Sequence, residues 1–202
     1  MDAHKLQLKI FAEPAATAEL TLDPFIVIFH RWIKERLLPE LVIDVANYAH
    51  VPNGPGVVLI GHGSDYFIDR LDGRLGLMSS RKRAGLAPAE RLTDLARRTL
   101  HAAALLEREP SLGGKLRFRP GELLFRLNDR LAAGNTDAAF AALKPEIEEL
   151  GKRLYAGPFE VTRVGGPKDL LSLRITSNAA APLGTLLERA GGPPAADASL
   201  VA

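Results

Sequence analysis

The chain has 202 residues, 47% of them hydrophobic, and a formal net charge of +2, values typical of one globular domain. It contains no cysteine, which excludes disulfides, zinc–thiolate sites and thiol nucleophiles. The N-terminus lacks the apolar segment of a signal peptide, and the longest bulky apolar run, residues 25–29, is far shorter than a membrane span. We therefore expect a cytoplasmic protein with no membrane partner.

The first half of the chain predicts a strand, a helix and three more strands. Residues 5–11 alternate polar and apolar side chains, which is the period of a half-buried strand. Asp23 followed by Pro24 predicts the start of a helix that runs to about residue 38, with Trp32 on its buried face. The three strands are expected at 41–51, 56–71 and 74–82, the last two joined by an Asp-Gly turn.

The second half predicts two helices and four strands. A helix is expected over residues 88–109 and another over 135–154, where the apolar period continues through Pro145 and predicts a kink. Residues 115–130 predict two strands that meet at Pro120-Gly121. The last two strands are expected at 159–164 and 170–176.

These elements predict an α+β fold of antiparallel sheets with helices on one side. The order strand, helix, strand, strand occurs twice, which indicates a structural duplication. We expect a single domain over residues 1–190, followed by a disordered tail at 191–202 that is rich in Pro, Ala and Gly. The two halves of this domain are predicted at 5–83 and 112–178, with the helix of residues 88–109 between them.

Residues 50–69, HVPNGPGVVLIGHGSDYFID, contain glycines, histidines and aspartates in a pattern that suggests several kinds of site. A phosphate-binding loop needs its glycines directly before a helix, and strands are predicted on both sides here, so we expect no nucleotide and no other cofactor. His50, His62 and Asp65 supply ligand types that a metal centre uses. The alternative is that these residues serve only as strand ends and turns.

Gly61-His62-Gly63-Ser64 resembles the GHGS motif that follows the first strand in chelatases of the sirohydrochlorin cobaltochelatase type. In that family the histidine belongs to a metal site, so the resemblance implies a metal-site role for His62 alone. The motif starts the domain in that family and precedes a helix. Here it lies in mid-chain before an expected hairpin.

The middle of the chain is basic. Residues 70–130 hold fourteen Lys/Arg against seven Asp/Glu, an asymmetry typical of surfaces that bind phosphates or acidic partners. Within the expected strand at residue 115, the basic residues alternate with apolar ones, which predicts one cationic face, and Arg126, Arg163 and Arg174 extend it. The candidate residues for an anionic partner are Arg81, Lys82, Arg83, Lys115, Arg117 and Arg119.

The runs HRWI, LVIDVANYAHVPNGPGVVLIGH, DGRLGL and, later, LNDRLAAGNT are similar to a group of uncharacterised bacterial proteins of similar length. This resemblance implies a bacterial origin and carries no functional residue. From the residues we predict a non-enzymatic binding or scaffold protein that self-associates and holds an acidic protein or nucleic acid at its basic middle. The alternative is a metal-dependent or small-molecule enzyme centred on His50, His62 and Asp65.

Overall fold

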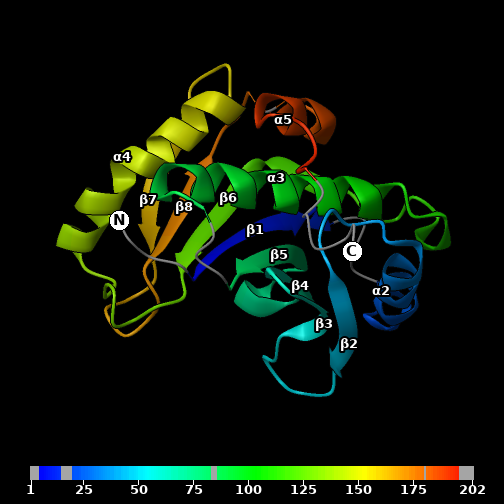
Figure 1. Cartoon of the computed structure of the whole chain (residues 1–202). Coiled ribbons are helices and arrows are strands. Elements are labelled where there is room, and N and C mark those ends of the chain that lie inside the picture. Colours follow the sequence, from blue (N-terminus) through cyan, green and yellow to red (C-terminus); the bar gives the residue numbers. More distant parts are fainter. Residues whose placement is uncertain (1–4, 15–19, 83–85, 180, 196–202) are drawn as a thin grey trace.

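The computed structural model describes residues 5–14, 20–82, 86–179 and 181–195. These residues form one eight-stranded antiparallel sheet with helices packed on one face (Figure 1). The strand order across the sheet is β2-β3-β4-β5-β1-β6-β8-β7. The predicted α+β class is confirmed, and the sheets expected from the two halves are joined into one by the pairing of β1 with β6.

The strands are β1 (Leu6–Ala12), β2 (Val42–Tyr48), β3 (Gly56–Gly61), β4 (Ser64–Asp69), β5 (Gly76–Arg81), β6 (Phe118–Leu127), β7 (Glu160–Val164) and β8 (Ser172–Thr176). The helices are α2 (Asp23–Glu35), α3 (Pro88–Glu107), α4 (Asp137–Leu154) and α5 (Leu183–Arg189), with short 3-10 turns at Leu71–Gly73 and Pro110–Leu112. None of the helices in the described residues is long and apolar enough to cross a membrane.

The two halves of the chain follow the same path around the β1–β6 pair. Each half starts with a central strand, crosses through a helix to an edge strand, and returns by antiparallel hairpins until its last strand pairs with its first. The edge strands β2 and β7 therefore correspond, as do β5 and β8, and each half ends in a further helix, α3 or α5. The first half is larger because four strands, not two, lead back to the centre.

The segment expected as one strand over 56–71 is two strands. A tight turn at His62 and Gly63 separates β3 from β4, and Ile60 pairs with Asp65 across the hairpin. The prediction that no helix starts at this glycine-rich stretch is confirmed. The single-strand prediction was wrong because Gly61 and Gly63 were not recognised as a turn between two short apolar runs.

Three other predictions differ from the structure. Residues 115–117 precede β6, and Pro120-Gly121 produces an irregularity within that one strand instead of separating two, since Ile10 pairs with Leu123 and Ala12 with Phe118. Helix α5 was not predicted. Within the predicted tail, Gly192 and Pro193 accept hydrogen bonds from Arg97 on α3, and residues 196–202 lie outside the described residues.

The core lies between the helices and one face of the sheet. In β1, Leu6, Leu8 and Ile10 point to this face and pack with helix residues into one cluster. The opposite face, which we call the open face, carries Gln7, Lys9 and Phe11 from the same strand. All seven residues of β1 are buried, so the middle of the open face is also screened from water.

Trp32 is fully buried on α2, and its ring lies 5.4 Å from that of Phe29, centroid to centroid. We predict that Trp32→Ala lowers the free energy of unfolding by about 3–5 kcal/mol, because the cavity cannot close around so large a deletion. Val27 lies on the same helix but is 72% exposed, so Val27→Ala should stay within about 0.5 kcal/mol of wild type. Urea unfolding of both variants measures the difference, and equal losses would contradict burial of the tryptophan.

Candidate functional site

The structure separates the residues expected at a metal site. His50 is exposed and lies in the turn between β2 and the start of β3. His62 directly follows the last residue of β3, and its amide donates to the Leu41 carbonyl. The six residues of β3 hold the two histidines about 20 Å apart, at roughly 3.3 Å per residue. No group of three or more His, Asp or Glu suited to a metal ion occurs among the described residues. The described residues therefore do not bring His50, His62 and Asp65 together as the alternative metal site requires.

The Gly-His-Gly-Ser turn does bind an anion, and that anion is a side chain of the same protein. Glu40, just before β2, is 1% exposed and accepts hydrogen bonds from the Gly63 amide (3.2 Å) and the Ser64 amide (2.8 Å). A Cβ at Gly63 would lie 3.1 Å from the Glu40 Oε2, and one at Gly61 would lie 2.3 Å from the Ser64 carbonyl oxygen. Gly61 is therefore needed for close backbone approach within this turn, and a side chain at Gly63 would press on the Glu40 carboxylate.

Glu40 is also the centre of a buried ionic network under α3. Its Oε1 accepts from the Tyr66 hydroxyl (2.5 Å) and from Nη1 of Arg98 (2.8 Å). Arg98 donates through Nε to Asp94 one turn earlier (2.9 Å), and Asp94 also accepts from Arg81 at the end of β5. The network joins α3 to the β2, β4 and β5 region of the sheet.

Burial and the Glu40 carboxylate together raise the pKa of Tyr66 well above its usual value. For Arg98, burial alone would lower the pKa, but the Glu40 carboxylate, Tyr66 and Asp94 raise it above its usual value. Tyr66 therefore stays neutral and Arg98 stays charged throughout the physiological range. With Glu40 and Tyr66 almost fully buried, a substrate has no access to these groups, so the network acts as structure.

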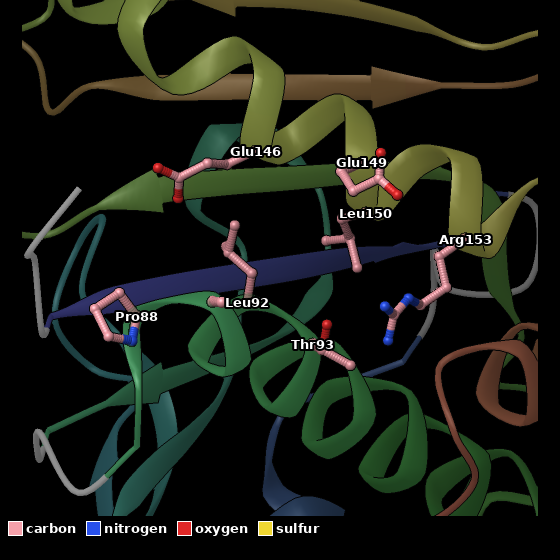
Figure 2. Close-up of a pocket in the computed structure, with 8 residues that line it drawn as sticks. Pro88, Leu92, Thr93, Glu146, Glu149, Leu150 and Arg153 are labelled. Atoms are coloured by element: carbon pink, nitrogen blue, oxygen red, sulfur yellow. The ribbon is translucent and has the colours of Figure 1, made fainter.

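A surface hollow of about 410 Å³ lies beside this network, between α3 and α4. Leu92 and Leu150 form its floor, and Figure 2 shows the Arg153 guanidinium turned toward Thr93 on the facing helix. The hollow continues into a second one of about 340 Å³ through Ala89, Thr93 and Arg153. Its charged rim mixes glutamates with arginines, so its charge does not select one sign of ligand.

The structure does not gather the predicted basic residues into one patch. Arg81 is 7% exposed and pairs with Asp94, and Lys82 pairs with Asp65 at 2.7 Å. Lys82 and Arg117 lie near opposite ends of β1. Lys82 follows the end of β5, which pairs with the start of β1, and Arg117 precedes the start of β6, which pairs with the end of β1. Arg83 lies outside the described residues.

The expected cationic row around residue 117 is also divided. Lys115 is exposed and precedes β6. Arg117 lies 3.9 Å from the Glu107 carboxylate at the end of α3, whereas Arg119 lies 3.8 Å from Glu122 on the open face. Arg163 points elsewhere again and donates to Asp137 at the start of α4.

Three arginines instead surround one carboxylate on the open face of the sheet. Arg74 binds Glu122 with both terminal nitrogens, at 2.9 and 2.6 Å. Arg174 on β8 and Arg119 lie 3.4 and 3.8 Å from the same carboxylate. We call Arg74, Arg119, Arg174 and Glu122 the arginine cluster.

The surroundings of the arginine cluster contain more charge of both signs. Arg126 lies two strand positions past Leu124 toward the end of β6, on the same face, and donates to the Ser172 hydroxyl (3.4 Å). Glu13 lies 3.7 Å from Arg119, and Glu160 is in line with Glu122 across β8 on the edge strand. Four arginines thus face Glu122, Glu13 and the more distant Glu160, which leaves this part of the open face net positive.

No protein-family model matches the chain, and no curated protein or solved structure matches it. The resemblance to a bacterial group therefore stays a prediction. The resemblance of the Gly-His-Gly-Ser turn to chelatases does not extend to its setting, because a strand and not a helix follows it.

Little in the sequence indicates the two buried acids, Glu40 and Glu122, that organise the site. Glu40 stands between Pro39 and a strand, and Glu122 lies in a strand with apolar neighbours. A single acidic residue inside an apolar run is a signal, since a buried carboxylate requires partners. Which arginines supply them depends on contacts 48 to 58 residues apart in the chain, and no local pattern records such contacts.

We predict that Glu40→Gln lowers the free energy of unfolding by about 3–5 kcal/mol, because it removes one of the two carboxylates that pair with the buried Arg98 and leaves Asp94 to balance both Arg98 and Arg81. The matched control is Glu148→Gln on α4, where the carboxylate is 38% exposed and pairs with Lys144. This control should change stability by less than about 1 kcal/mol. Urea unfolding of both variants tests the claim, and comparable losses would refute it.

A second prediction concerns acid. Hydrogen bonds from Arg74, with the charges of Arg174 and Arg119, hold the pKa of Glu122 below its usual value. A depressed pKa in the folded state adds stability that is present above the unfolded pKa of about 4.3 and is lost as pH falls through the folded value. Glu122→Gln should therefore be less stable than wild type at pH 7, and the gap should narrow below about pH 4. Unfolding curves across this pH range measure the gap, and a constant gap would contradict the assignment.

Proposed function

We propose that the protein is a non-enzymatic binding protein of the cytoplasm that self-associates and holds an acidic partner against the arginine cluster. The observation that carries the proposal is the convergence of three guanidinium groups on Glu122 at the open face. Glu122 and Glu13 supply two negative charges against three arginines, and the arginine side chains remain 30–43% exposed. A partner's carboxylates can therefore reach them from solvent.

The chemistry of the cluster favours an acidic protein segment. Arginine binds carboxylates through paired N–H groups, and Glu122 already demonstrates that geometry with Arg74. Proteins that bind single-stranded nucleic acid place aromatic side chains among the basic ones. Within the described residues, the only ring with a cation–π contact to an arginine of the cluster is Phe11, which lies under Arg74 and is fully buried.

The alternative function, a metal-dependent or small-molecule enzyme at His50, His62 and Asp65, receives no support from the geometry. The two imidazoles lie at opposite ends of β3, and the Asp65 carboxylate pairs with Lys82. The binding proposal is therefore preferred.

The test removes two charges from the cluster and two from outside it. Arg119→Gln with Arg174→Gln should weaken binding of poly-L-glutamate by about tenfold at low salt, since exposed ion pairs contribute up to about 1 kcal/mol each. Wild-type binding should also fall steeply with salt. Titration followed by fluorescence anisotropy gives both affinities.

The matched control is Lys115→Gln with Arg117→Gln, which changes the net charge equally but leaves the cluster intact. It should bind poly-L-glutamate nearly as well as wild type. Equal losses in the two double variants, or no binding by wild type at low salt, would refute the proposed site. Tighter binding of duplex DNA than of poly-L-glutamate would identify nucleic acid as the partner instead.

A further inference from the structure

The edge strand β2 is the most exposed strand of the sheet. Of the six large apolar side chains that the described residues leave exposed, four lie on or beside it: Leu41 (42%), Ile43 (57%), Tyr48 (44%) and Val51 (39%). The opposite edge, β7, contributes none to this set. Exposed apolar side chains that gather along one sheet edge are typical of an interaction surface.

The backbone of β2 is also open to pairing. Alternate residues of an edge strand turn their amide and carbonyl groups away from the sheet. The Val45 amide donates to the carboxylate of Asp44 beside it, at 2.8 Å, which places Val45 in the outward row, and Asn47 follows two residues later. Natural edges are commonly protected by lysine, proline or a β-bulge. β2 contains neither lysine nor proline, and its irregularity between Val42 and Asp44 is confined to one end of the strand.

We infer that the protein forms a two-fold symmetric dimer in which β2 pairs antiparallel with β2 of a second copy, with the axis at Ala46. This inference rests on the self-association in the proposed function and names its surface. The dimer is a closed, isologous assembly in which the same patch is used twice. It extends each eight-stranded sheet across the interface.

The second copy fits because the strand is complementary to itself in this register. Val45 and Asn47 of one copy face Asn47 and Val45 of the other, so the outward amides and carbonyls meet. Asp44, the only charged residue of β2, faces Tyr48 and not another carboxylate. The exposed apolar end at Leu41 and Ile43 meets the Ala49–Val51 end of the partner, which covers apolar surface on both copies.

The Asp44 carboxylate changes its partner on pairing. In the single chain, the Asp44 carboxylate accepts a hydrogen bond from the Val45 amide. In the dimer, the Val45 amide donates instead to a carbonyl of the second copy. The carboxylate then faces the phenol of Tyr48. The irregularity between Val42 and Asp44 limits the regular pairing to the five residues from Asp44 to Tyr48.

The absence of cysteine from the chain permits a direct test. Across the proposed axis Ala46 faces itself in a non-hydrogen-bonded pair, for which the Cα atoms lie about 4.5 Å apart, within the range of about 4.4–6.8 Å that a disulfide spans. Ala46→Cys should therefore form a covalent dimer on mild oxidation, seen on a non-reducing gel. Val27→Cys, at an exposed position on α2, is the control and should stay monomeric on the same gel.

Oligomeric mass provides the second measurement. Ile43→Glu with Tyr48→Glu should weaken dimer formation at least about tenfold relative to wild type in analytical ultracentrifugation. The Glu at residue 48 faces Asp44 of the second copy, and both substitutions remove apolar contact. Val27→Glu with Leu131→Glu makes the same chemical change at two other exposed apolar positions and should leave the dimer unchanged. Circular dichroism checks that all variants are folded.

The outcomes separate the interface from the proposed function. A wild-type monomer at every concentration would overturn both the β2 dimer and self-association. A wild-type dimer that the β2 variants leave intact, without a disulfide at Ala46→Cys, would overturn β2 alone. Binding of poly-L-glutamate is measured on the arginine cluster and does not depend on either result.

Discussion

The buried carboxylate of Glu40 is the constraint on which the first half of the fold depends. An unpaired carboxylate in a protein interior is so costly that the surrounding structure must supply donors. Here they come from three places: the amides of the β3–β4 turn, the Tyr66 hydroxyl on β4, and Arg98 on α3. One side chain thus fixes the turn, the adjoining strand and the helix that covers them.

The same requirement explains why the middle of the open face can be both polar and buried. Lys9, 1% exposed, donates to Asp69 (2.6 Å) and to the Leu71 carbonyl (2.7 Å), and Phe11 beside it lies under the Arg74 guanidinium at 3.8 Å. Arg74 therefore has two roles, because it covers Phe11 and binds Glu122. Arg74 is thus held by contacts on two sides, which favours binding without rearrangement of this side chain.

Features with a local cause were predictable from the sequence. Asp23 followed by Pro24 starts a helix, Thr136 caps another by accepting from the Ala139 amide, and the apolar period that continues past Pro145 places this proline within α4. The alternation in residues 5–11 correctly indicated a strand, although it did not reveal that both of its faces are buried. Local propensity and period were sufficient for these elements.

Features that depend on distant residues were not predictable. The rows of basic residues suggested a cationic patch. In the structure, however, Arg81 is buried and pairs with Asp94, and Arg117 lies near Glu107 at the end of α3. Arg74 binds Glu122 at the centre of the arginine cluster, but in the sequence it is a single basic residue after the Asp-Gly turn and is not part of a row of basic residues.

The proposed β2 interface and the arginine cluster are related, because side chains along a β-strand alternate between the two faces of the sheet. In the register through Ala46, Asp44 faces Tyr48, and both residues belong to the open face of their own copy. The open faces of the two copies are therefore continuous, and both arginine clusters lie on one side of the extended sheet.

At about 4.8 Å per strand, the two arginine clusters of the dimer are on the order of 50 Å apart. An acidic segment long enough to span that distance can bind both clusters, and its second contact then forms at a high effective concentration. Self-association through β2 would in this way convert two weak, exposed ionic sites into one tight and salt-sensitive site.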